Sequence, residues 1–173
     1  VKTAPFRAGA QLLEYGETPV PWIVETIGGG GANSAFTAAA LGAKVAFLGK
    51  VGADALGNKL EAALRRHGIA AYLARDPQRP TGTSLALTFD DGHRHFVSCQ
   101  PNNEALAFED LDLGALAGHD HLFRADIWFS KAMLFGGNQR LFRAARDAGL
   151  TISIDLNWDP QWGVASAAEV RAR

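Results

Sequence analysis

Apolar and polar positions follow a helical period in one central segment of the chain. Leu56, Leu60 and Leu64 recur every four residues, which places the three leucines on one face of a helix. Asp54 stands where an N-cap is preferred, and Gly68 stands where a helix typically ends. The pattern therefore predicts a helix that begins after Asp54 and buries its leucine face.

The period changes to two over residues 83–89, where three large apolar side chains alternate with small or polar ones. Such alternation is typical of a strand with one buried face. Asp91-Gly92 is a common hairpin turn, and a further extended run over residues 93–99 follows it. This region therefore predicts a β-hairpin.

Short apolar runs and helix-forming runs alternate along the rest of the chain. The predicted elements are strands at residues 11–15 and 22–26, a helix at 32–41, strands at 44–48 and 125–130, a helix at 138–148 and a strand at 150–156. This alternation favours a doubly wound α/β sheet, which the hairpin interrupts. We expect an α/β fold that carries a small β appendage.

Composition and charge narrow the class of protein without pointing to a function. The 173 residues are 47% hydrophobic and 20% charged, which suffices for one globular domain without metal or disulfide support. A net charge of −1 and the lack of a long apolar run argue against nucleic acid and membrane as partners. Cys99 is the one cysteine, and we expect it to be a small buried residue. A cytoplasmic protein is the simplest expectation.

Four consecutive glycines, Gly28 to Gly31, precede a run of small helix-forming residues. Their backbone N–H groups can approach a phosphate or a polyhydroxylated ligand closely, because no Cβ stands in the way. A P-loop requires Lys followed by Ser or Thr after its last glycine, but Ala32-Asn33 follows here. A dinucleotide fingerprint requires a glycine where Asn33 or Ser34 stands. Neither nucleotide motif is therefore present in this loop.

Several short motifs follow one another in an informative order. They are Gly28-Gly29-Gly30-Gly31-Ala32-Asn33, Leu41-Gly42-Ala43, Gly49-Lys50-Val51-Gly52, Ala53-Asp54-Ala55-Leu56-Gly57, Arg79-Pro80-Thr81-Gly82, Asp91-Gly92 and Asp155-Leu156-Asn157. In this order they resemble the PfkB, or ribokinase-like, carbohydrate kinases over nearly the whole chain. The resemblance implies a three-layer α/β/α fold with a small β-sheet lid. It implies a single, partial domain over residues 1–173, with lid strands at about 8–27 and 71–100 inserted in the α/β core.

The resemblance also implies a function, which is ATP-dependent phosphorylation of a sugar hydroxyl with ATP and Mg²⁺ as cofactors. It places Gly28, Gly29 and Asn33 at the sugar, where the amide of Asn33 can both donate to hydroxyls and accept from them. The alternative for Asn33 is a helix cap. A homodimer through the lid is a further implication.

The resemblance extends to three later residues of the sugar pocket. Asn103 matches the family's Gly-Ala-Asn-x-x-Leu stretch, whose first two residues differ here, and the alternative is an ordinary loop asparagine. Asp155 and Asn157 follow a predicted strand, at the end where α/β sheets bind ligands, and the alternative is a turn and cap. Asp159 replaces an arginine of the sugar-acid kinases, which slightly favours a neutral sugar such as fructose or ribose over a sugar acid.

No catalytic residue is assigned, because the family's Asp-Thr-x-Gly-Ala-Gly-Asp motif occurs nowhere in the 173 residues. The family's leading strand would lie before Val1, so we expect the chain to be part of a longer kinase. No metal ligand is assigned either, since His119-Asp120-His121 has no third partner nearby. The alternative functions are a non-catalytic sugar- or nucleoside-binding module and a nucleoside kinase of the same family.

Overall fold

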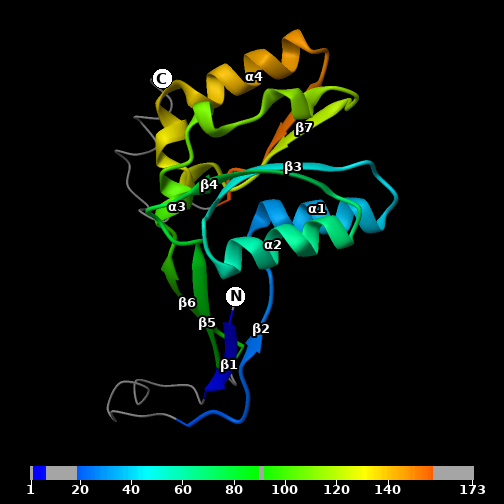
Figure 1. The fold of residues 1–173 in the computed structure, drawn as a ribbon. Helices are drawn as coiled ribbons and strands as arrows, with labels where there is room; N and C mark the ends of the chain where they lie inside the picture. Colours follow the sequence, from blue (N-terminus) through cyan, green and yellow to red (C-terminus); the bar gives the residue numbers. More distant parts are fainter. Residues whose placement is uncertain (1, 7–18, 90–91, 158–173) are drawn as a thin grey trace.

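The computed structural model describes residues 2–6, 19–89 and 92–157. Figure 1 shows the strands β1 (Lys2–Phe6), β2 (Val24–Glu25), β3 (Ala46–Gly52), β4 (Ala70–Asp76), β5 (Thr83–Phe89), β6 (Arg94–Cys99), β7 (His121–Arg124) and β8 (Thr151–Ile154). The helices are α1 (Gly30–Ala40), α2 (Ala55–Arg66), α3 (Pro101–Glu104) and α4 (Asn138–Asp147). The predicted strand at 11–15 and the residues Asp91 and Asp159 lie outside the described residues. No described helix is both long enough and apolar enough to cross a membrane.

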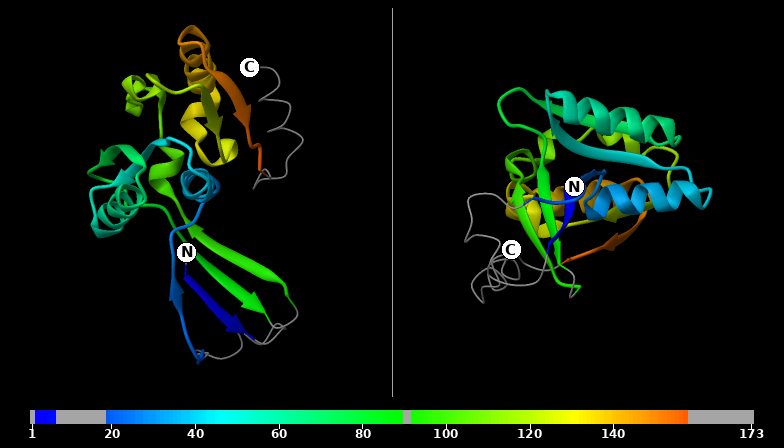
Figure 2. Two further views of the ribbon diagram at one scale, coloured as in Figure 1. Left: turned by 90° about the vertical axis from the view of Figure 1, so that its right-hand side faces the viewer. Right: turned by 90° about the horizontal axis from the view of Figure 1, so that it is seen from below.

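Strands β3, β4, β7 and β8 lie between α4 on one side and the pair α1 and α2 on the other (Figures 1 and 2). β3 and β4 pair in parallel, and so do β7 and β8. Parallel neighbours need a crossover connection, which α2 supplies for the first pair and α4 for the second. This layering confirms the predicted α/β class.

A separate four-stranded sheet, in the order β2-β1-β5-β6, extends away from these layers (Figure 1), and we call it the lid sheet. β5 and β6 form the predicted hairpin, in which Thr83 pairs with Cys99 and Thr88 with Arg94. β4 pairs with β3 instead, so the lid sheet takes only the residues from Thr83 onward out of the expected range 71–100. Cys99 is exposed on β6, which corrects the expectation of a buried thiol.

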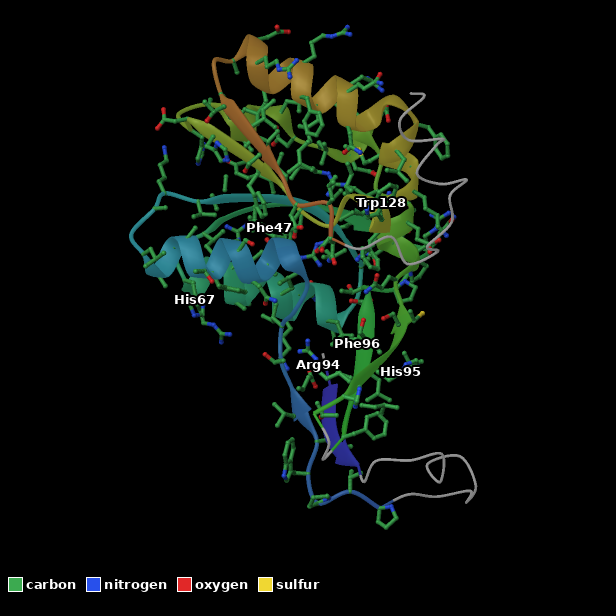
Figure 3. The ribbon with its side chains drawn as sticks, turned by 180° about the vertical axis from the view of Figure 1, so that it is seen from behind. Phe47, His67, Arg94, His95, Phe96 and Trp128 are labelled. Atoms are coloured by element: carbon green, nitrogen blue, oxygen red, sulfur yellow. The ribbon has the colours of Figure 1, made fainter. Side chains whose placement is uncertain are left out.

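Two apolar clusters hold the layers together. In the first, Ala35 of α1 and Leu64 of α2 pack with Phe47 of β3, which Figure 3 shows beside α1. In the second, Ala145 of α4 packs with Leu150 at the start of β8. Leu64 and Ala145 are fully buried, with 0% of their surface exposed, so α2 and α4 are each anchored near their C-terminal ends.

The helix predicted after Asp54 is confirmed as α2. Asp54 is its N-cap, because the N–H of Gly57 donates to Asp54 Oδ1 at 2.8 Å. Leu60 and Leu64 belong to the apolar cluster, but Leu56 in the first turn is 41% exposed. The buried face is therefore narrower than the leucine spacing predicts.

The strand predicted over residues 125–130 is wrong. Strand β7 ends at Arg124, and Asp126 has a φ of 54°, a left-handed conformation that ends the extended chain. Ile127–Phe129 then forms a 3-10 turn in which Ile127 is buried. The apolar run that suggested a strand is thus explained by a turn that buries its first residue.

Candidate sugar site

A cavity of about 1140 Å³ lies mainly within the α/β layers, where Leu116, Leu141 and Leu150 line it, and it reaches the lid sheet. Its walls come from residues 28–31, which we call the glycine loop, from β3, from the end of β7, and from Ser84, Phe96 and Ser98 of the lid sheet. Figure 3 labels Phe96 on this sheet. Consecutive residues of β3 and β7 line the cavity, and each strand has one hydrogen-bonded neighbour among the described residues. The cavity therefore runs along two strand edges and ends at the glycine loop.

The glycine loop meets a carboxylate from a distant part of the chain. Gly29 has a φ of 94° and starts α1 without any side-chain cap. Instead, the N–H of Gly30 donates to Asp126 Oδ2 at 2.7 Å. A Cβ on Gly30 would lie 2.8 Å from both carboxylate oxygens of Asp126, so the close approach requires glycine at this position. The helix dipole also favours a negative group at the start of α1.

Asp126 is the residue that the sequence interpretation missed. Its other oxygen, Oδ1, accepts a hydrogen bond from Asn157 Nδ2 at 2.6 Å. Asp126 and Asn157 have φ values of 54° and 51°, and no other non-glycine residue in the described ranges has a positive φ. Asp and Asn tolerate this conformation best, at a cost on the order of 1 kcal/mol each. Once β7 is seen to end at Arg124, Asp126 stands at the carboxyl end of a parallel strand, where α/β sheets bind ligands.

The side chain of Arg124 lies close to this carboxylate in the sequence but turns to other partners. Its Nε donates to Asn138 Oδ1 at 3.0 Å, and its Nη2 is buried without a hydrogen-bond partner among the described residues. Burial lowers the pKa of the guanidinium, and the charge of Asp126 acts in the opposite direction. The positive charge of Arg124 therefore partly offsets the negative charge of Asp126 at this end of the cavity.

Four of the six predicted site residues line the cavity, namely Gly28, Gly29, Asn103 and Asn157. Asn33 and Asp155 are not part of the lining. The N–H of Asn157 donates to Asp155 Oδ1 at 2.8 Å, a contact of the kind that the turn alternative expects. Asp155 thus acts on the site through the conformation of Asn157.

Asn33 lies inside α1 rather than at its start. It is exposed, its N–H donates to the carbonyl of Gly29 at 3.0 Å, and its own carbonyl accepts from Thr37 Oγ1 at 2.9 Å. Because Gly29 is the N-cap of α1, the alternative in which Asn33 caps the helix is wrong.

Asp54 holds the start of the lid sheet as well as α2. Thr81 donates its N–H to Asp54 Oδ2 at 2.7 Å and its hydroxyl to Oδ1 at 2.7 Å. The N–H of Thr81, followed by that of Gly57, holds the pKa of Asp54 below its ordinary value of 3.8. Asp54 does not line the cavity, so its carboxylate is a structural brace rather than a base.

The wall of the cavity nearest the lid sheet carries two asparagines of α3. Asn103 Oδ1 lies 2.8 Å from the position of a Cβ on Gly82, so the two residues are in close contact. Asn102 is 0% exposed and donates from Nδ2 to the carbonyl of Lys50 at 2.6 Å. Asn102 Oδ1 has no partner among the described residues, and a buried acceptor left unpaired costs about 1–3 kcal/mol. Asn102 is thus a second residue of this wall that sequence reasoning missed.

His121 of β7 contacts the neighbouring strand β8 through both of its ring nitrogens. The Nδ1 of His121 lies 2.7 Å from Thr151 Oγ1, and its Nε2 lies 2.7 Å from Ser153 Oγ. Among residues 2–6, 19–89 and 92–157, no group of three or more His, Cys, Asp or Glu is arranged to hold a metal ion. His121 therefore supports the β7–β8 pairing.

Comparison with known proteins decides the family. Residues 12–168 match the family described as pfkB family carbohydrate kinase. The chain belongs to this family. The match covers most of the 173 residues and includes the glycine loop, the hairpin of the lid sheet and the segment after β8. The resemblance drawn from the motifs is thus confirmed.

Individual relatives of this PfkB chain carry several names. The bifunctional protein HldE of Bradyrhizobium sp. (strain ORS 278) is 36% identical over 150 residues, which are 80% of this chain and 31% of the relative. A fructokinase of Vibrio alginolyticus is 29% identical over 151 residues, covering 87% and 48% of the two chains. A D-beta-D-heptose 7-phosphate kinase of Bordetella bronchiseptica is 30% identical over 150 residues, covering 83% and 47%. The chain therefore spans about a third to a half of the length of these relatives.

Solved structures show the same fold. A PfkB protein from Polaromonas sp. JS666 has a TM-score of 0.78 at 23% identity, covering 99% of this PfkB chain and 58% of that chain. A fructokinase with bound ATP from Xylella fastidiosa has a TM-score of 0.76 at 21% identity, covering 98% and 54%. These similarities confirm the ribokinase-like architecture.

Proposed function

We propose that the protein carrying this chain transfers the γ-phosphoryl group of ATP to a hydroxyl of a sugar. Membership of the PfkB family supports this reaction class, as do relatives named fructokinase and heptose 7-phosphate kinase. The single observation that carries the proposal within this chain is the meeting of the glycine loop, the lid sheet and the end of β7 around one cavity.

In this proposal the described residues form the acceptor side of the reaction. Gly28 and Gly29 let the backbone approach the sugar, because neither carries a Cβ. Asn103 and Asn157 line the same cavity and offer amides that both donate to hydroxyls and accept from them. Asn33 and Asp155 remain proposed sugar-site residues on the strength of the resemblance. The lid sheet would exclude water, which suppresses wasteful hydrolysis of the donor.

ATP and Mg²⁺ enter the proposal through the family. The N–H of Gly30 is already taken by the carboxylate of Asp126, so a second anion is not suited to the start of α1. The part of the chain that the structure describes holds no cluster of three ligand-type side chains for a cation. The described residues offer neither an anion site at the start of α1 nor a cluster of cation ligands, so the proposal places the nucleotide and its metal outside them.

A neutral sugar such as fructose or ribose is the proposed acceptor. The arginine that suits an acidic sugar is replaced by Asp159, and several relatives are named fructokinase. A sugar phosphate is the second candidate, because two of the relatives carry the names HldE and heptose 7-phosphate kinase. The two candidates differ in the charge of the acceptor and therefore predict different responses to a substrate panel.

The test is ATP-dependent release of ADP by the intact protein with a panel of acceptors. The panel contains fructose, ribose, a heptose 7-phosphate and a nucleoside, with a reaction lacking acceptor as the control. We expect the largest stimulation with a neutral sugar. Stimulation only by the phosphorylated heptose or only by the nucleoside would show that this compound, and not a neutral sugar, is the acceptor. No stimulation by any of them would contradict the proposed activity.

We further propose a cytoplasmic enzyme that forms a homodimer through the lid sheet. Ile23, Leu85 and Val97 lie on or beside this sheet and are 61%, 39% and 56% exposed, which is an unusual amount of apolar surface to leave in water. Light scattering on the intact protein should give twice the monomer mass, and Val97→Asp should lower it. A monomeric intact protein would contradict the dimer.

A further inference from the structure

Asp126 joins three segments that are far apart in the sequence. The N–H of Gly30 donates to Asp126 Oδ2 at 2.7 Å, and Asn157 Nδ2 donates to Oδ1 at 2.6 Å. These residues come from the start of α1, the end of β7 and the segment after β8, and all three line the same cavity. The carboxylate is therefore fixed at the cavity wall from two sides.

The two hydrogen bonds leave accepting capacity on both oxygens of this carboxylate. A carboxylate has about four lone-pair positions, two on each oxygen. The Gly30 and Asn157 donors occupy one position on Oδ2 and one on Oδ1. Buried acceptors are almost always paired, so a ligand that displaces water from this end of the cavity must bring donors of its own.

We propose that Asp126 accepts hydrogen bonds from two hydroxyls of the acceptor sugar and so selects a substrate with an adjacent pair of hydroxyls. The inference rests on the proposed function and adds to it the residue that recognises the substrate. Two neighbouring hydroxyls match the two oxygens in number and in spacing, whereas an anionic substituent brings no donor and is repelled by the carboxylate. Any phosphate or carboxylate on the substrate must therefore point away from Asp126.

A purely structural role for Asp126 leads to a different expectation. In that case the carboxylate only holds the glycine loop against the segment after β8, and its loss lowers the affinity for every sugar by the same factor. Direct recognition makes the loss depend on which hydroxyls the sugar carries. Discrimination among deoxy sugars therefore separates the two roles.

The experiment is titration calorimetry on the intact protein, with the best acceptor from the ADP panel and each of its monodeoxy analogues. In the wild type we expect two adjacent deoxy positions to weaken binding by roughly 10- to 100-fold each, the usual effect of leaving a charged acceptor unpaired. Asp126→Ala should bind the parent sugar as weakly as these analogues and should no longer distinguish them. Asp112→Ala is the matched control, because Asp112 is exposed, its carboxylate accepts from the nearby N–H of Gly114, and it does not line the cavity.

The outcomes separate this inference from the proposed function. Suppose that the wild type releases ADP with a sugar but Asp126→Ala retains the full discrimination among deoxy sugars. Asp126 then does not bind the sugar hydroxyls, and the inference is overturned. If the wild type neither binds nor phosphorylates any sugar, the proposed function fails and takes the inference with it. If Asp126→Ala does not fold, Asp126→Asn preserves the side-chain size, and we expect it to reduce the discrimination for both hydroxyls, because a neutral amide binds hydroxyls less strongly than a carboxylate does. Unchanged discrimination in that variant would equally overturn the inference.

Discussion

Two aspartates, Asp54 and Asp126, each connect distant segments of the chain, but they differ in how many hydrogen-bond accepting positions their carboxylates leave unoccupied. Asp54 accepts three hydrogen bonds, from the N–H of Gly57 and from the N–H and hydroxyl of Thr81. Asp126 accepts two, from Gly30 and Asn157, and it lines the cavity whereas Asp54 does not. The capacity of a carboxylate to bind a ligand thus depends on its unoccupied lone pairs and on its exposure to a cavity. Its presence in a sequence motif is a weaker indication.

The largest expected effect is the loss of stability when the carboxylate of Asp54, which connects α2 to the start of the lid sheet, is removed. Asp54→Ala deletes the N-cap of α2 and both contacts to Thr81, and it should lower the free energy of unfolding by about 2–4 kcal/mol. Thr81→Val removes the hydroxyl, which donates to Asp54 and accepts from the N–H of Gly52, and it should cost about 1–2 kcal/mol. Urea denaturation of the intact protein measures both. Equal free energies of unfolding for Asp54→Ala and the wild type would show that the hydrogen bonds to Asp54 do not stabilise the fold.

The next largest expected effect is a loss of sugar affinity that differs between two neighbouring residues of the glycine loop. A Cβ on Gly30 meets the Asp126 oxygens at 2.8 Å, whereas a Cβ on Gly31 meets Phe47 at an ordinary 3.6 Å. Gly30→Ala must displace the carboxylate, so sugar affinity should fall roughly tenfold, which is about 1.4 kcal/mol. Gly31→Ala leaves the Asp126 carboxylate in place and should lower the affinity less than Gly30→Ala does. Equal affinities for the two variants in calorimetry would contradict the role of Asp126.

The hydrogen bonds to Asp54 also predict a pH dependence of the free energy of unfolding. The pKa of Asp54 is lowered in the folded state, first by the N–H of Thr81, so its stabilising contribution is complete above the unfolded value of 3.8. The contribution is lost as the pH falls through the lower folded-state pKa, because the protonated side chain no longer attracts these donors as strongly. Unfolding free energies measured between about pH 2 and pH 6 should therefore fall less steeply with acid for Asp54→Asn than for the wild type. Parallel curves would contradict this assignment.

The smallest expected effect concerns Asn33, one turn along α1 from Gly30. Asn33 is exposed and lies outside the cavity lining, although the resemblance places it at the sugar. We expect Asn33→Ala to weaken sugar binding by about 1 kcal/mol, less than Gly30→Ala or Asp126→Ala. A loss larger than that of Asp126→Ala, in the same calorimetric assay, would move the centre of the sugar site from Asp126 to Asn33.

The same comparison shows which features could be predicted from the sequence. The helix α2, its cap Asp54 and the hairpin of β5 and β6 depend on periodicity and on contacts a few residues apart, and these predictions are confirmed. The contacts from Thr81 to Asp54 span 27 residues and leave no local pattern. Local signals thus define the elements but not the bonds between them.

Asp126 shows why part of the site could not be predicted. The apolar run that follows it favoured a strand over 125–130, which placed Asp126 inside an element instead of at its end. Its partners Gly30 and Asn157 are 96 and 31 residues away, and they approach only after the parallel strands and α1 are packed. The motif that did flag Asn157 came from the resemblance and not from periodicity.

The most direct test is a crystal structure of the intact protein with its preferred acceptor sugar. The account predicts two sugar hydroxyls within about 2.5–3.0 Å of Asp126, one on each carboxylate oxygen, while Gly30 and Asn157 keep their own bonds to it. A sugar bound in the cavity with no hydroxyl within hydrogen-bond distance of Asp126, or bound instead beside Asp54, would contradict the account.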